Sequence, residues 1–296
     1  MIAAPIFAAA ALAAGSASSV VAKVETGGQP CGIAEAAGSI WVTDAANGRL
    51  LRVDPSSNKV VASSMLDPTP CELHAAVGSL WVVTQSGKVD RVDPSSGEVV
   101  ARVAVGRVSY DLAFGAGSIW VTNREGRTVQ RISPATNRVT RTLRFPGGGK
   151  PAGIAFSRGG LWIGDDVGTA VYRLDARRLR WTRVPTRQLA SSWVAASPGA
   201  VWVSNTASNT VTRIDTARRR ATTTVKVCAS PVNLEVVGGD VWVPCDRGNA
   251  LARISLRTRK RVETIAMPAP AVVAGGLGDV WASAFESGQV WRLRAG

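Results

Sequence analysis

The chain has 296 residues, with 35 Lys and Arg against 21 Asp and Glu, and a formal net charge of +14. This length allows one large domain or two ordinary ones, and 46% hydrophobic residues with only 19% charged residues exclude a chain that is disordered throughout. The single His excludes any catalytic or metal site that needs two imidazoles from one chain. Ten Trp against two Tyr and five Phe is an unusual excess, and its cause lies in the order of the sequence.

The first 18 residues are expected to lie outside the fold. Residues 1–22 carry no charge, residues 2–14 are apolar and rich in Ala, and small residues follow at 15–18. This pattern is similar to a secretory signal, although the usual basic start is absent. The alternative is the end of a membrane anchor in a longer protein, but the apolar run is short for a spanning helix. We therefore expect an exported protein (secreted, periplasmic or cell-surface) with a signal-like or anchor segment at 1–18 and one domain at 19–296.

A repeat with a period close to 40 residues fills the rest of the chain. A Gly-x-apolar-Trp block recurs seven times and places its Trp at Trp41, Trp81, Trp120, Trp162, Trp202, Trp242 and Trp281. A Pro or Ser stands eleven residues before each Trp, and an Arg follows ten or eleven residues after it. Three landmarks that stay in phase exclude a chance match, so the repeat accounts for seven of the ten Trp.

Each repeat predicts four short strands. The first begins at the Pro, the second contains the Trp, and the third alternates around the Arg. A turn such as Asp54-Pro55-Ser56-Ser57 then leads into the fourth. Alternating apolar residues, β-branched side chains and turn residues at short spacing are typical of strands and hairpins. The sequence therefore predicts an all-β, seven-bladed β-propeller with four-stranded blades.

The two ends of the chain predict how the ring closes. The last repeat stops after its third strand, at residues 291–296. Residues 19–24 (SVVAKV) match residues 98–103 (EVVARV), which form a predicted fourth strand. We therefore expect the N-terminal strand to complete the last blade, which leaves no open sheet edge at the junction.

Four Cys in an exported chain suggest disulfides. Cys228 and Cys245 flank the first two strands of blade six on one face and are a candidate pair. Cys31 and Cys71 occupy equivalent positions in neighbouring blades and are a second candidate pair, which depends on the separation of their Cα atoms. A zinc site built on these Cys is disfavoured, because no Cys-x-x-Cys pair is present and the chain has one His.

The repeat provides an internal control for function. The Trp and Arg found in every blade are expected to be scaffold, whereas residues found in one blade are candidates for a site. Such residues gather at the start of the first strand and the end of the second, on the face where loops converge on the channel. The predicted binding residues are Glu72, Tyr110, Asp111, Asp165, Trp193, Asn205 and Asn233. The alternative is that they hydrate the channel mouth and cap loop amides.

Individual residues of this set suggest different chemistry. Trp193 would stack a planar or sugar ligand, or would plug the channel. Glu72 and Asp111, together with Asp165 and Asn233, are candidate oxygen ligands for Ca²⁺ or Mg²⁺. His74 and Glu235 replace an Ala that the other blades share, and we interpret His74 as an interior histidine rather than a base. No catalytic residue is predicted.

The repeat as a whole resembles that of the virginiamycin B (streptogramin) lyase-like propellers and, more loosely, the YVTN and NHL-type propellers of bacterial extracytoplasmic proteins. The residues that carry the resemblance are Pro-x-Gly-Ile-Ala at 30–34, Gly-x-apolar-Trp-Val at 38–42 and Arg-apolar-Asp-Pro at 52–55. The resemblance implies lyase chemistry that uses His and Glu side chains with a divalent ion. This chain has only His74, and none of its positions three after the repeat Trp is Glu or His. Since such repeats host lyases, lactonases, sensors and adhesion modules, the resemblance predicts fold better than activity.

We expect a non-enzymatic propeller that binds a ligand at the channel mouth, as in a sensor or receptor ectodomain. The partner would be a small molecule, an envelope polymer or a protein, rather than nucleic acid, and the domain would be a monomer with the membrane near its N-terminal segment. The alternative is a divalent-metal-assisted lyase or lactonase. A third hypothesis is that a basic surface binds an anionic polymer. Its residues lie on the predicted outer hairpins of blades four to six: Arg177, Arg178, Arg180, Arg183, Arg218, Arg219, Arg220, Arg257, Arg259, Lys260 and Arg261.

Overall fold

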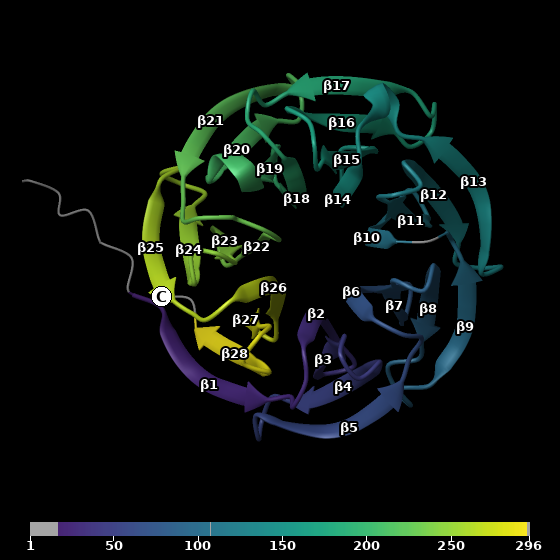
Figure 1. The fold of residues 1–296 in the computed structure, drawn as a ribbon, viewed down its shortest axis with the longest axis vertical. Helices are drawn as coiled ribbons and strands as arrows, with labels where there is room; N and C mark the ends of the chain where they lie inside the picture. The colour runs from purple at the N-terminus through teal and green to yellow at the C-terminus, as the bar shows by residue number, and fades with distance from the viewer. Residues whose placement is uncertain (1–16, 107, 295–296) are drawn as a thin grey trace, which may run out of the picture.

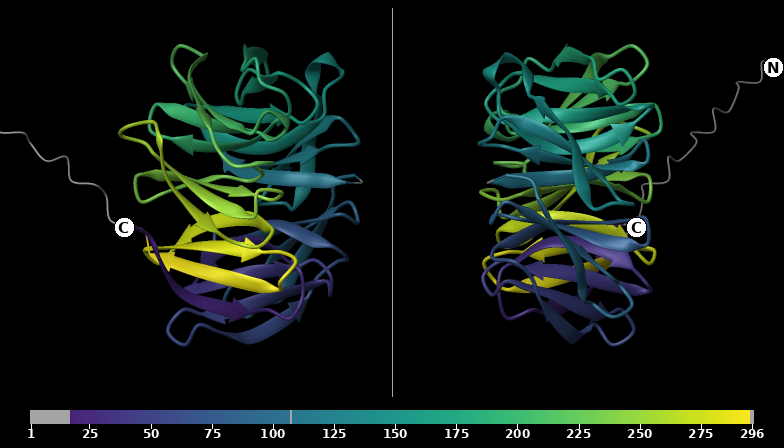
Figure 2. Two further views of the ribbon diagram at one scale, coloured as in Figure 1. Left: turned by 60° about the vertical axis from the view of Figure 1, so that its left-hand side comes forward. Right: turned by 90° about the vertical axis from the view of Figure 1, so that its right-hand side faces the viewer.

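The structure is a computed structural model that describes residues 17–106 and 108–294. Within these residues, 28 strands form seven four-stranded antiparallel blades around a central axis (Figure 1). The first strand of each blade lies nearest the axis and the fourth forms the rim, and the side views show the resulting disc (Figure 2). The predicted all-β, seven-bladed propeller is confirmed. Residues 1–16 of the predicted signal-like segment lie outside the described residues.

Blades one to four follow one another along the chain. Blade one holds β2 (Pro30–Ala36), β3 (Ser39–Asp44), β4 (Arg49–Asp54) and β5 (Lys59–Met65). Blade two holds β6 (Pro70–Ala76), β7 (Ser79–Thr84), β8 (Lys88–Val92) and β9 (Val99–Ala104). Blade three holds β10 (Ser109–Gly115), β11 (Ser118–Asn123), β12 (Thr128–Ser133) and β13 (Arg138–Arg144). After the short 3-10 helix η1 (Pro146–Gly148), blade four holds β14 (Pro151–Ser157), β15 (Gly160–Asp165), β16 (Ala170–Asp175) and β17 (Trp181–Pro185).

The remaining blades complete the ring. Blade five holds β18 (Ser191–Ser197), β19 (Ala200–Asn205), β20 (Thr210–Asp215) and β21 (Arg220–Lys226), with the 3-10 helix η2 (Thr206–Ser208) between its second and third strands. Blade six holds β22 (Glu235–Val237), β23 (Asp240–Cys245), β24 (Ala250–Ser255) and β25 (Arg261–Ala266). Blade seven holds β26 (Pro270–Gly276), β27 (Asp279–Ala284), β28 (Gln289–Arg294) and β1 (Ser19–Glu25). No helix in the described part of the chain is long and apolar enough to cross a membrane.

The closure of the ring follows the prediction. Strand β1 pairs antiparallel with β28, and Val24 stands opposite Val290. Val24 is buried and lies in an apolar cluster with Ile33 of blade one and Trp281 of blade seven. The N-terminal strand thus joins the first and last blades through both hydrogen bonds and apolar packing.

The repeated Trp and Arg are scaffold residues, as expected. All seven Trp are at most 2% exposed, and Trp41 packs against Leu73 and Val82 of the next blade. Arg91 lies opposite Trp81 in the strand ladder, with its guanidinium carbon 5.1 Å from the ring centroid. The same Arg donates a 2.7 Å hydrogen bond to the carbonyl of Pro134 in the next blade. Trp and Arg therefore hold neighbouring blades together.

The repeated Gly has a local cause. The first two strands of each blade are joined by a two-residue turn, and in blade one its residues Ala37 and Gly38 have φ values of 49° and 69°. Two successive positive φ values are typical of the type I′ hairpin turn. Gly adopts this conformation without the steric cost of a Cβ atom, which explains the Gly that precedes every Trp.

Both candidate Cys pairs form disulfides. The Cα atoms of Cys31 and Cys71 lie 4.8 Å apart, and this bond joins the first strands of blades one and two. The Cα atoms of Cys228 and Cys245 lie 5.7 Å apart. Both separations fall in the range that a disulfide spans without moving the backbone.

Blade six departs from the predicted pattern, because its first strand is short. The sequence predicts a strand from Pro231 onward, but β22 begins at Glu235, and Pro231 forms only an isolated bridge with Cys245. Pro244, at the facing position of β23, has no N–H to donate to the ladder. The Cys228–Cys245 disulfide ties this irregular segment to β23.

Candidate functional site

A cavity of about 450 Å³ lies where the first strands begin and the second strands end. Three of the predicted site residues line it, namely Glu72, Tyr110 and Trp193. The Cys31–Cys71 disulfide forms another part of its wall. Four further lining residues come from loops after second strands and were not predicted: Gln85, Asp246, Phe285 and Glu286. We call this space the mouth cavity.

Two aromatic side chains form one wall of the mouth cavity. The ring centroids of Tyr110 and Trp193 lie 5.0 Å apart with an interplanar angle of 32°. The guanidinium of Arg124 lies 5.9 Å from the Tyr110 ring and is held by Asp166 through a hydrogen bond of 2.7 Å. Asp166 also accepts a hydrogen bond from the Ser192 hydroxyl at 2.8 Å. The Arg124–Asp166 ion pair therefore lies next to the Tyr110 ring of the aromatic pair.

A smaller cavity of about 200 Å³ is lined by residues further along the first strands. His74, Asn233 and Glu235 line it, and Glu72 lines both this cavity and the mouth cavity. Glu72 therefore lies between the two spaces.

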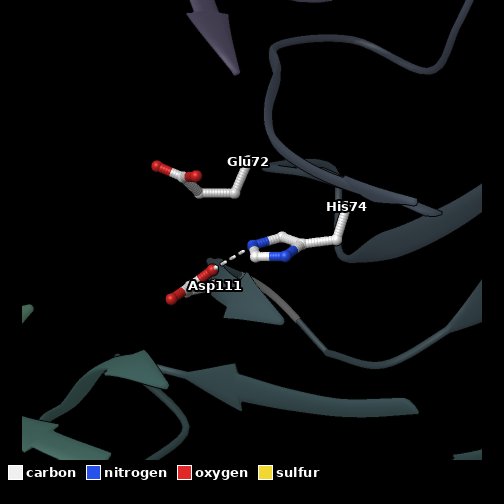
Figure 3. Close-up of side chains that lie close together, drawn as sticks. All are labelled: Glu72, His74 and Asp111. Atoms are coloured by element: carbon white, nitrogen blue, oxygen red, sulfur yellow. Dashed lines mark ion pairs between the residues drawn. The ribbon is translucent and has the colours of Figure 1, made fainter. Parts of the chain in front are cut away.

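Three titratable side chains meet beside this second cavity (Figure 3). Glu72 and His74 come from β6 and Asp111 from β10, and one ligand atom from each lies within 4.8 Å of the other two. The His74 Nε2 atom is 3.4 Å from an Asp111 oxygen. No other group of three His, Cys, Asp or Glu side chains in the described residues has a comparable arrangement.

The two carboxyl groups of this cluster are held differently. Asp111 accepts hydrogen bonds from its neighbour Leu112 at 2.7 Å and from Ile154 of blade four at 2.8 Å, both through backbone N–H groups. Glu72 is 4% exposed, and no described residue donates a hydrogen bond to its carboxyl group. Backbone amides therefore orient the Asp111 carboxyl group, whereas the Glu72 carboxyl group borders the two cavities without such support.

Burial and mutual repulsion shift the titration of the channel groups. Burial, followed by the charges of Asp111 and Glu235, raises the pKa of Glu72 well above its usual value. Burial raises the pKa of Glu235 to about 7, although His74 opposes this change. Burial disfavours the charged imidazole, but contact with Asp111 and the charge of Glu235 outweigh it and raise the pKa of His74. Each of these three groups therefore holds its proton to a higher pH than the same group does in water.

The remaining predicted residues bind their own loops or a neighbouring strand. The Asn233 side-chain oxygen accepts a hydrogen bond from the Val273 amide at 3.4 Å, as Asp111 does from Ile154. Asp165 accepts hydrogen bonds from the Lys150 and Val167 amides at 3.1 and 3.3 Å.

Asn205 is fully buried at the end of β19. It accepts a hydrogen bond from the Ser191 hydroxyl at 2.9 Å and donates one to the Thr212 hydroxyl at 2.9 Å. The structure thus brings Glu72, Tyr110, Asp111 and Trp193 together with Asn233 nearby, while Asp165 binds loop amides and Asn205 binds neighbouring strands of its own blade.

The sequence marks His74 and Glu235 as unusual residues, but neither belongs to the predicted binding set. In each repeat the position seven residues before the Trp is Ala, except in blades two and six. These two exceptions line the same cavity from opposite parts of the ring. The loop residues of the mouth cavity lacked such a signal, because the loops vary in every blade.

Comparison with known proteins supports the fold. No protein-family model and no curated protein sequence matches the chain. The crystal structure of selenomethionine-substituted virginiamycin B lyase from Staphylococcus aureus is similar, with a TM-score of 0.82 and 18% identity over 94% of this chain and 99% of that chain. A streptogramin B lyase structure is similar with a TM-score of 0.79 and 17% identity, over 92% of this chain and 94% of that chain. The resemblance predicted from the repeat is confirmed at the level of fold: the chain shares the β-propeller fold of these two lyases.

Proposed function

We propose that this protein is an exported, non-enzymatic propeller that binds a small ring-bearing molecule in the mouth cavity, as a binding or sensing domain. The observation that carries this proposal is the Tyr110–Trp193 pair, with its rings 5.0 Å apart on the cavity wall. Aromatic faces favour stacked contacts with other planar or sugar rings. A volume of about 450 Å³ suits a compact ligand of this kind.

The position of Trp193 within the repeat supports a role beyond packing. The equivalent residue is Gly32 in blade one and Gly153 in blade four, so the scaffold does not need a large side chain there. Trp193 also packs against the apolar cluster of blades five and six, so its side chain is held in place at the cavity wall, where it would serve a ligand.

Saturation-transfer difference NMR with a panel of ring compounds tests this proposal. The panel would contain indole, phenol, benzamide, glucose and N-acetylglucosamine. We expect at least one compound to bind and Trp193→Ala to weaken its binding by about fivefold or more, because a stacking partner is lost. The matched control is Phe114→Ala, which removes a 44% exposed aromatic side chain from the same strand as Tyr110 but outside the mouth cavity. Absence of binding, or equal weakening in both variants, would refute the proposal.

The two disulfides support export. Such bonds persist in oxidising compartments and are rare in reducing ones. The apolar segment at 1–18 is consistent with this assignment.

Metal-assisted lyase or lactonase activity is the second candidate, and one observation favours it. The pair of His74 and Asp111, with Glu72 beside it, provides groups that can accept and donate protons. The candidates are distinguished by incubating the protein with virginiamycin B, with and without Mg²⁺, and measuring by chromatography how much of the compound is lost. We expect the wild-type protein to consume no more virginiamycin B than the His74→Ala variant does. Consumption that requires both His74 and the metal would favour the enzyme.

A further inference from the structure

We infer that Glu72, His74 and Asp111 form a binding site for a first-row transition-metal dication, with Zn²⁺ as the representative ion. This site shares Glu72 with the mouth cavity but does not include Tyr110 or Trp193, so it can be tested separately from the proposed ring-binding function.

The distances in the cluster fit a tetrahedral ion. Zn²⁺ binds His nitrogen and carboxylate oxygen at about 2.0–2.2 Å, which places two tetrahedral ligand atoms about 3.4 Å apart. The His74 Nε2 and Asp111 oxygen are 3.4 Å apart, which is long for a hydrogen bond but matches this ligand spacing. All three ligand atoms lie within 4.8 Å of one another, so the Glu72 oxygen would have to move closer to the other two to share an ion with them.

Two further observations point to a ligand rather than to a structural cluster. Glu72 is 4% exposed, lines both cavities and accepts no hydrogen bond from a described residue, so its carboxyl group is available to an ion that enters them. Asp111 is oriented by the Leu112 and Ile154 amides, as the supporting contacts of metal ligands commonly are. Glu235, a third carboxyl group, lines the same cavity.

The type of ion follows from the donor atoms. Ca²⁺ and Mg²⁺ take oxygen ligands, whereas an imidazole with two carboxylates suits Zn²⁺ and related ions. The chain has one His, and its four Cys are all in disulfides. A side-chain imidazole or thiolate ligand elsewhere in the chain is therefore excluded, which makes the site simple to test.

Isothermal titration calorimetry with ZnCl₂ on the tag-free, disulfide-intact chain is the experiment. We expect one Zn²⁺ per chain, and we expect His74→Ala and Glu72→Gln each to weaken binding by about tenfold or more. His74→Ala installs the residue found at this position in five other blades, and Glu72→Gln keeps the side-chain shape, so both should fold. Thermal unfolding would verify this. Glu286→Gln, which removes a carboxylate of the mouth cavity outside the cluster, is the matched control and should bind Zn²⁺ as the wild type does.

The contrary results are specific. Absence of Zn²⁺ binding, or binding that survives both cluster variants, would overturn the site. Ca²⁺ or Mg²⁺ binding of equal or greater affinity than Zn²⁺ would overturn the role of His74. Trp193→Ala should leave Zn²⁺ binding unchanged, so failure of the metal site and failure of the ring-binding proposal remain distinguishable.

Discussion

Glu72 and Asp111 occupy the same position in neighbouring blades, nine residues before the Trp, but their carboxyl groups meet opposite surroundings. Asp111 accepts two backbone hydrogen bonds, one of which reaches the next blade. Glu72 accepts none from the described residues and is held close to the negative charges of Asp111 and Glu235. Asp111 stabilises the fold through these hydrogen bonds, whereas Glu72 contributes no such hydrogen bond. We therefore expect Glu72 to have a functional role.

This contrast predicts different effects on stability. Asp111→Ala leaves two buried amides without an acceptor, which costs about 1–3 kcal/mol for each. Glu72→Gln removes no hydrogen bond that described residues provide and relieves repulsion, so it should cost far less. Urea unfolding of the two variants measures the difference. If Glu72→Gln were as destabilising as Asp111→Ala, Glu72 would be a structural residue.

At the scale of elements, the candidate site lies at the first strands and at loops after second strands, and the other strands form the scaffold. Blade six shows how local chemistry interrupts the pattern, since Pro244 shortens β22 and a disulfide replaces part of the ladder. The amide of Val232 still donates a 2.9 Å hydrogen bond to the Pro244 carbonyl. The disulfide is therefore expected to stabilise this segment locally.

Replacing Cys228 and Cys245 together by Ser tests that role. The disulfide links residues 17 apart, and a closed loop of this size contributes about 3 kcal/mol to stability. We expect this loss in urea unfolding, together with faster hydrogen exchange at Val232. The Cys31→Ser/Cys71→Ser double variant is the control, because it should destabilise the fold without selectively loosening blade six. Unchanged exchange at Val232 in the first variant would contradict this account.

The elements were predicted well because every blade repeats the same landmarks. The Trp, Pro and Arg spacings predict the four strands, and the match between residues 19–24 and 98–103 predicts the closure by β1. The sequence predicts a site at the start of the first strands, and Glu72, Tyr110 and Trp193 from this position line the mouth cavity. The approach of His74 to Asp111 could not be predicted, because it depends on side-chain directions between two blades. For the same reason, the sequence does not predict that Asp165 binds loop amides or that Asn205 binds the strands beside it.

At the scale of the whole molecule, the net charge of +14 does not describe the mouth cavity. Eleven Lys and Arg of blades four to six are all exposed on the outer hairpins: Arg177, Arg178, Arg180, Arg183, Arg218, Arg219, Arg220, Arg257, Arg259, Lys260 and Arg261. We call them the basic arc. The described lining of the mouth cavity instead includes the carboxyl groups of Glu72, Asp246 and Glu286. Charge on the rim discourages edge strands from pairing with other chains.

The basic arc is expected to contact anionic polymers only through screened, non-specific attraction. Retention on a heparin column should therefore occur at low salt and disappear near physiological ionic strength, where the screening length is about 8 Å. Arg218→Glu/Arg219→Glu/Arg220→Glu should reduce the retention at low salt. Retention of the wild type that persists well above physiological salt would show a dedicated polymer-binding surface and contradict this expectation.

The central claim is that the mouth cavity is where this propeller meets its ligand. A crystal structure of the protein with the tightest-binding ring compound of the panel tests it most directly. We predict density for the compound against the Tyr110–Trp193 pair in the wild type and none there in Trp193→Ala. A compound bound elsewhere on the molecule, or bound equally in both proteins, would contradict the claim.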